Sequence, residues 1–132
     1  MRPVTQQHYL GCGAACLAFI LKIDYQDVIK ALGADEHKLG NKGLLCKELV
    51  GFLNSQGFDY RWKYVNRKIR KVIYNHGVIV FIKRSKRYPP GHFLVRYKDR
   101  WMDPWINWSK IDRQSGFRKR LPGRPIYAIL PK

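Results

Sequence analysis

The spacing of apolar residues predicts helices in the first half of the chain. Residues 11–22 (GCGAACLAFILK) combine two early glycines with an almost unbroken apolar run, which is typical of a loop turning into a helix buried on all sides. Asp24 is a suitable N-cap for a second helix that runs to Leu32 and stops at Gly33. A third helix is predicted at residues 42–56, a short strand at residues 58–65, and a fourth helix at residues 66–75.

Beyond residue 76 the apolar runs are rich in β-branched and aromatic side chains, which favour strands. Strands are predicted at residues 77–83, 92–97, 100–103 and 125–130. Only Lys98 and Asp99 separate two of these runs, a spacing that suits a tight hairpin. Residues 107–124 are expected to form a long basic loop. The prediction is an α+β fold in one domain, residues 1–132, with the central helix of a helical N-terminal half packed on a C-terminal antiparallel sheet.

The composition fits a globular protein, since 45% of the 132 residues are apolar and 14% are aromatic. The longest wholly apolar run, residues 14–21, is shorter than the ~20 residues that cross a bilayer, and it does not resemble a secretory signal. A cytoplasmic location is therefore expected. Cys12, Cys16 and Cys46 cannot all pair with one another, which fits a reducing compartment.

The charge of the chain is high and unevenly placed. Its net charge is +17, of which +1 falls on residues 1–58 and +16 on residues 59–132. Such a basic half attracts an anionic partner, although it also serves as a well-solvated face. One functional alternative is a nucleic-acid-binding module without catalysis, in which residues 61–71 and 110–124 contact phosphates while three tryptophans stack on bases: Trp101, Trp105 and Trp108.

Cys12 is the strongest candidate for a nucleophile. It lies directly before the apolar helix, whose amide dipoles favour negative charge at that end, and a thiol reacts as its thiolate. Gly11 and Gly13 flank it and would let a substrate backbone approach closely. Cys16 and Cys46 are expected to fill space in the core. Cysteine and histidine spacings do not match a zinc site, so no metal or cofactor is expected.

His92 and Asp103 are the candidate partners of the thiol. If Tyr97 pairs with Arg100 in the hairpin, Asp103 falls within about two residues of the position opposite His92, so the two side chains can meet. A hydrogen bond from the imidazole to Asp103 would fix its tautomer and stabilise the imidazolium. Asn107 is the alternative orienting residue.

Several of these segments together resemble the C39 family of papain-like cysteine peptidases: Val4-Thr5-Gln6-Gln7, Gly11-Cys12-Gly13-Ala14-Ala15-Cys16-Leu17-Ala18, Gly91-His92-Phe93-Leu94-Val95 and Asp103-Pro104. The resemblance implies a Cys12, His92 and Asp103 triad in a papain-like fold, with Gln6 donating to the oxyanion. Gln7 replaces Gln6 if the register slips. The resemblance also implies cleavage of a peptide or protein substrate, for example after a Gly-Gly pair in a leader peptide. The family's transporter domain has no counterpart in this sequence.

The expected peptide groove includes positions on both sides of the nucleophile. Gly91, Trp101 and Trp105 are expected to contact the substrate together with the two glycines beside Cys12. The same cysteine chemistry also fits a papain-like toxin or effector that acts on another cell's proteins.

Overall fold

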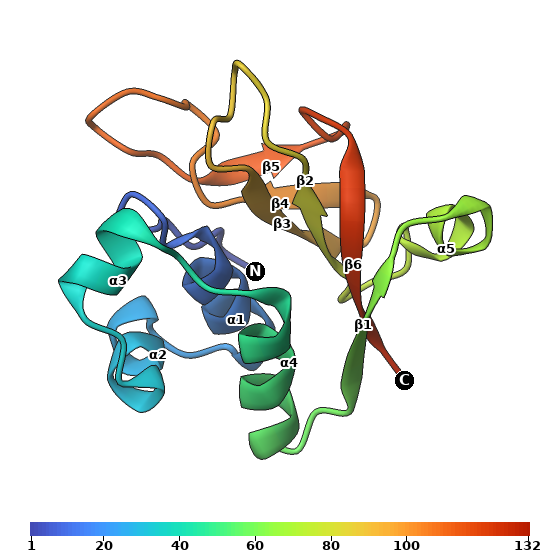
Figure 1. Ribbon diagram of the computed structural model, residues 1–132, viewed down its shortest axis with the longest axis horizontal. Coiled ribbons are helices and arrows are strands. Elements are labelled where there is room, and N and C mark those ends of the chain that lie inside the picture. The colour runs from blue at the N-terminus through green and yellow to red at the C-terminus, as the bar shows by residue number, and fades with distance from the viewer.

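The computed structural model describes all residues from Met1 to Lys132, with helices first and strands after them. Figure 1 shows α1 to α4 gathered on one side of a single sheet, with α5 apart from them. No helix is both long enough and apolar enough to span a membrane. In chain order the elements are α1 (Cys12–Leu21), α2 (Tyr25–Leu32), α3 (Glu36–Asn41), α4 (Cys46–Ser55), β1 (Tyr60–Tyr64), α5 (Arg67–Val72), β2 (Ile79–Ile82), β3 (His92–Tyr97), β4 (Arg100–Asp103), β5 (Gly116–Arg118) and β6 (Pro125–Pro131).

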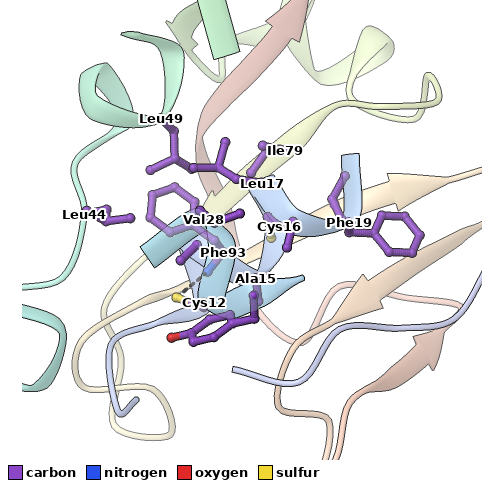
Figure 2. Packing of buried hydrophobic residues seen from close by; sticks show 14 of the residues in the cluster. Cys12, Ala15, Cys16, Leu17, Phe19, Val28, Leu44, Leu49, Ile79 and Phe93 are labelled. Carbon is purple, nitrogen blue, oxygen red and sulfur yellow. Dashed lines mark hydrogen bonds between the residues drawn. The ribbon is translucent and has the colours of Figure 1, made fainter. Parts of the chain in front are cut away.

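The predicted central helix is confirmed as α1. Every residue from Cys12 to Phe19 is buried, because α2 and α4 cover one side of α1 and β3 covers the other. Figure 2 shows these side chains enclosed by residues of the neighbouring helices and strands. The prediction for α2 is also confirmed, since Gly33 ends the helix in the left-handed conformation at φ +65°.

The third predicted helix differs from the structure at its start. It begins at Cys46 rather than near residue 42, because Gly43 adopts φ +74° and turns the chain so that Leu44 is buried outside the helix. The preceding helix, α3, was not predicted. It buries only Leu39, so its sequence carries no apolar periodicity, and it is defined instead by the Asp35 side chain accepting a hydrogen bond from the Lys38 N–H.

The sheet has the strand order β1-β6-β2-β3-β4-β5, and every neighbouring pair is antiparallel. The α+β fold class is therefore confirmed, and the sheet is wider than the four C-terminal strands predicted. At one edge β1 pairs with β6, which joins the middle of the chain to its end. At the other edge β5 pairs with β4, although residues 107–124 were predicted to be a loop without a strand.

Side chains alternate between two apolar clusters on opposite faces of the sheet. Val95 belongs to the cluster between the sheet and the helices, whereas its neighbour Leu94 belongs to the cluster on the far face. Ile73, at the end of α5, is fully buried in that far cluster. The ends of β3 and β4 that carry His92 and Asp103 therefore lie between two packed layers.

Candidate active site

Cys12 is the first residue of α1, and only 8% of its surface is exposed. Figure 2 shows its sulfur beside β3, where the backbone N–H of Phe93 donates a hydrogen bond to Cys12 Sγ at 3.4 Å. The amide dipoles of this ten-residue helix favour negative charge at its N-terminal end. The thiol thus lies at the positive end of the helix dipole and beside the residue that follows His92.

The three glycines expected at the substrate groove have different roles in the structure. A Cβ atom at Gly11 would lie 2.1 Å from the Tyr25 hydroxyl, and one at Gly13 would crowd a leucine of α4 at 3.2 Å. Both glycines are buried, so the packing of α1 requires them, and the structure does not place them in the groove. Gly91 does line the hollow that contains Cys12, at φ +74°, and a Cβ there would lie 2.2 Å from the Phe81 ring.

His92 and Asp103 meet across the hairpin formed by β3 and β4. The predicted pairing of Tyr97 with Arg100 is confirmed, and from this register the two side chains come together at one end of the strands. His92 Nε2 lies 2.7 Å from Asp103 Oδ1, and both residues are almost fully buried. The carboxylate accepts the Nε2–H, which holds the ring in one orientation and leaves Nδ1 free for another partner.

Asp103 has two further partners besides the imidazole. The Trp105 backbone N–H donates to Oδ1 at 2.9 Å, and Arg118 Nη1 donates to Oδ2 at 3.0 Å. Arg118 was not predicted to belong to the site, because nothing in the local sequence distinguishes it from the other basic residues of the expected loop. Asn107, the alternative orienting residue, bonds instead to two backbone groups of its own loop. Asp103, and not Asn107, therefore bonds to the imidazole.

These contacts move the proton affinities of the pair in opposite directions. Burial lowers the pKa of His92, but the hydrogen bond to Asp103 and the nearby Cys12 raise it more strongly, to about 9. Burial raises the pKa of Asp103, but the hydrogen bond to His92, the Trp105 N–H and Arg118 outweigh it and hold that pKa below its usual value. The structure thus favours an imidazolium beside a carboxylate.

Two aromatic rings confine the imidazole. Tyr88 stacks on His92 with the ring centroids 5.3 Å apart, and the Trp108 ring lies 6.2 Å from it. Trp108 is itself held by its indole N–H, which donates to the carbonyl oxygen of Arg87 at 2.6 Å. The ring therefore has little freedom to turn away from Asp103.

Gln6 is 1% exposed, but its side-chain amide is already occupied. Nε2 donates to the carbonyl oxygens of His8 and Tyr9, each at 3.0 Å, so both of its N–H groups bond within the loop that leads to Cys12. Gln6 Oε1 is buried without a hydrogen-bond partner. Gln7, the alternative, is exposed and bonds to Gln26. In this arrangement Gln6 shapes the loop before the nucleophile.

The two tryptophans expected at the groove lie in different places. Trp101 is fully buried in the far cluster, with the Arg96 guanidinium over its ring at 5.2 Å, because alternation along β4 directs Met102 toward the helices and Trp101 away from them. The structure does not bring Trp101 to the cleft, either for a peptide or for a stacked base. Trp105 is 3% exposed and does line a hollow beside the cleft.

The remaining cysteines and histidines occupy other parts of the fold. Burial, together with Cys12 and Asp103, raises the pKa of Cys16 well above its usual value, and burial raises that of Cys46 to about 11. His8 bonds to the Tyr25 hydroxyl at 2.8 Å. No three or more His, Cys, Asp or Glu side chains lie close enough together to hold a metal ion.

Cys12 lines a hollow with a volume of about 470 Å³. Its walls come from the loop before α1, the segment between α3 and α4, and the turn before β3, and they include Leu44, Gly91 and Phe93. A second hollow of about 470 Å³, mainly apolar, shares Leu44 and Phe93 with the first. The two hollows form a continuous surface that begins at Cys12.

Comparison with known proteins supports the fold. No protein-family model matches this sequence, and a search of curated proteins finds no relative. Among solved structures, the chain is similar to the peptidase domain of Streptococcus ComA, a bi-functional ABC transporter involved in a quorum-sensing pathway. The match covers 99% of this chain and 98% of that chain, with a TM-score of 0.62 and 16% sequence identity. The fold is similar to that of this peptidase domain. At this identity the likeness establishes the architecture alone.

Proposed function

We propose that this chain is a cysteine peptidase in which Cys12 is the nucleophile, His92 transfers protons and Asp103 orients the imidazole. The observation that carries the proposal is the hydrogen bond from the Phe93 N–H to Cys12 Sγ at 3.4 Å, next to a His92 ring bonded to Asp103 at 2.7 Å. Cys12 is also close enough to His92 to raise the pKa of the imidazole, so the thiol and the imidazole belong to one site. The peptidase-domain fold, matched over 99% of the chain, supports the same activity.

The proton path follows from the orientation of the ring. Since the Nε2–H of His92 bonds to Asp103, Nδ1 is the nitrogen that accepts the thiol proton. Cys12 Sγ then attacks the peptide carbonyl, forming an S–C bond while the π electrons move to oxygen. As the C–N bond breaks, Nδ1–H protonates the leaving nitrogen. Water next gives a proton to Nδ1 and attacks the thioester, and the sulfur leaves with the electrons of the S–C bond.

The oxyanion of this reaction needs hydrogen-bond donors near Cys12. The backbone N–H of Cys12 is one donor, because the first N–H groups of a helix have no partner inside the helix. Gln6 is the second donor implied by the C39 resemblance. Its side-chain N–H groups reach the oxyanion only if substrate binding breaks the hydrogen bond to the carbonyl oxygen of His8 or Tyr9. If both bonds remain, Gln6 only holds the loop before Cys12 in place.

The finer proposal is cleavage after a Gly-Gly pair in a leader or precursor peptide. The C39-like motifs around Cys12 and His92 support it. The mixed hollow at Cys12 continues at Leu44 and Phe93 into the mainly apolar one, and together they offer a surface for the residues before the cleaved bond, because apolar grooves bind apolar peptide side chains.

Thiol labelling tests the nucleophile without a known substrate. We expect iodoacetamide, followed by mass spectrometry, to modify Cys12 well before Cys16 or Cys46, whose raised pKa values keep them protonated at neutral pH. His92→Ala should slow labelling of Cys12 and leave that of Cys46 unchanged. Equal labelling of Cys12 and Cys46 in the folded protein would argue against a catalytic thiol.

Peptide cleavage tests the activity itself. Synthetic peptides with an apolar segment before Gly-Gly should be cut by the unmodified chain and by Cys46→Ala, but not by Cys12→Ala, with the fold monitored by circular dichroism. Replacing Gly-Gly with Leu-Leu should abolish cleavage if the finer proposal holds. Full activity of Cys12→Ala would disprove the assigned nucleophile.

A further inference from the structure

A third hollow, of about 580 Å³, lies beside the cleft and shares Tyr9 and Pro89 with the hollow that contains Cys12. We call it the leaving-side groove. The residues that matter for its chemistry are Tyr9, Lys86, Arg87, Trp105, Trp108 and Arg113. The peptidase reaction proposed above does not use its charge.

The groove is positively charged and contains no acid. Lys86, Arg87 and Arg113 line it, no Asp or Glu does, and none of these three cations takes part in an ion pair in the structure. Arg113 is held in place, because its guanidinium lies over the Trp105 ring at 4.6 Å. Its Nε is nevertheless buried without a hydrogen-bond partner. A guanidinium fixed in a groove without acidic residues suits an anionic ligand.

The aromatic side of the groove is rigid. The Trp105 and Trp108 rings lie 4.5 Å apart, and Tyr9 packs against both of them at 6.1 Å and 5.7 Å. The two indole N–H groups are used, one on the Lys110 carbonyl at 3.1 Å and the other on a carbonyl of the facing loop. Trp105 is also almost fully buried. Tyr9, which is 40% exposed, and the half-buried Trp108 form the accessible part of this wall, against which an apolar side chain packs.

The position of the groove decides which part of a peptide reaches it. Trp108, in its wall, lies 6.2 Å from the His92 ring, so the groove begins on the imidazole side of the nucleophile. In the proposed reaction His92 protonates the leaving nitrogen as the C–N bond breaks. The chain that follows the cleaved bond therefore departs on this side, toward the three cations.

We propose that the leaving-side groove binds the segment that follows the cleaved bond, and that it selects segments carrying Asp or Glu together with an apolar side chain. The carboxylates would pair with Arg87, Arg113 and Lys86, and the apolar side chain would pack on the aromatic wall. The inference rests on the proposed peptidase function, because it takes the direction of the peptide from the reaction.

Binding to an inactive variant tests the groove apart from catalysis. In the Cys12→Ala background, a fluorescein-labelled peptide with Glu residues and one Phe should bind more tightly than its Gln counterpart by about fivefold or more, as expected for two partly exposed ion pairs. Adding Arg87→Gln and Arg113→Gln should remove the difference. The matched control, Lys68→Gln with Lys71→Gln, removes the same charge from exposed positions of α5 and should retain it. Equal losses in the two double variants would overturn the proposal, since they would indicate attraction by net charge alone.

Two further results separate the groove from the peptidase function. If the unmodified chain cuts Gly-Gly peptides with Glu or Gln after the cut at equal rates, the proposed function stands and the groove inference fails. If no peptide is cut although the Glu peptide binds through Arg87 and Arg113, the peptidase function fails, and with it the direction assigned to the groove. Displacement of the Glu peptide by single-stranded oligothymidylate at lower concentration than by unlabelled Glu peptide would identify a nucleic-acid site and overturn the proposal.

Discussion

Replacing Asp103 with asparagine tests the electrostatics on which the site depends. Asparagine keeps the shape, and its oxygen can still accept the Nε2–H of His92, so the change removes the charge and the bond from Arg118 Nη1. The pKa of His92 is about 9 against an ordinary 6.5, and this difference corresponds to about 3 kcal/mol in favour of the imidazolium. One opposite charge nearby moves a pKa by about 1 to 3 pH units. We therefore expect the His92 pKa to fall by about that amount in Asp103→Asn.

Nuclear magnetic resonance measures this pKa directly. The Cε1–H signal of His92 is followed as a function of pH, and the His92→Gln variant identifies it among the signals of the four histidines. Asp99→Asn is the matched control, because it removes the same charge from the exposed turn between β3 and β4. A His92 midpoint that stays near 9 in Asp103→Asn, or that falls equally in Asp99→Asn, would refute the reasoning.

The same pair affects stability with a defined sign. Because the folded-state pKa of His92 lies above its ordinary value, its contribution to the free energy of unfolding is complete below about pH 6.5 and is lost as the pH rises through about 9. Between about pH 6 and about pH 10, urea denaturation should show a loss that is larger in the unmodified chain than in Asp103→Asn by roughly 1 to 4 kcal/mol. A loss of the same size in both would contradict the pairing.

Two further predictions concern residues that support the site. Gly91→Ala should cost about 1 to 3 kcal/mol more than Gly33→Ala in urea denaturation, because both glycines have positive φ but only a Cβ at Gly91 meets another atom, the Phe81 ring at 2.2 Å; equal costs would contradict this packing. Arg118→Ala should raise the pKa of Asp103, whose contribution to stability is lost as the pH falls. Circular dichroism should therefore show that acid unfolding begins at a higher pH in this variant than in the control, Lys119→Ala. Identical acid midpoints would mean that Arg118 does not hold the carboxylate.

Local sequence was sufficient for those parts of the fold that bury a continuous apolar pattern. The run before Leu21 identified α1, and the spacing around Lys98 and Asp99 gave the register that joins His92 to Asp103. It was insufficient for α3, which buries one residue, and for β5, whose three half-buried residues form a strand only because β4 is there to pair with. Strand pairing is a property of two segments, and a short edge strand carries little pattern of its own.

For this protein the sequence alone determined which chemistry is available: a thiol at the start of an apolar helix, a histidine and an aspartate at the ends of a hairpin, and a strongly basic second half. Only the tertiary structure decided how these groups are used. Alternation along β4 buried Trp101 behind the sheet, and the pairing of β5 brought Arg118 to Asp103. The loop before Cys12 folds so that its carbonyl oxygens accept both side-chain N–H groups of Gln6. Contact between the loops that carry Arg87 and Trp108 forms part of the leaving-side groove. Contacts between segments far apart in the chain depend on how the whole chain packs, which no local pattern records.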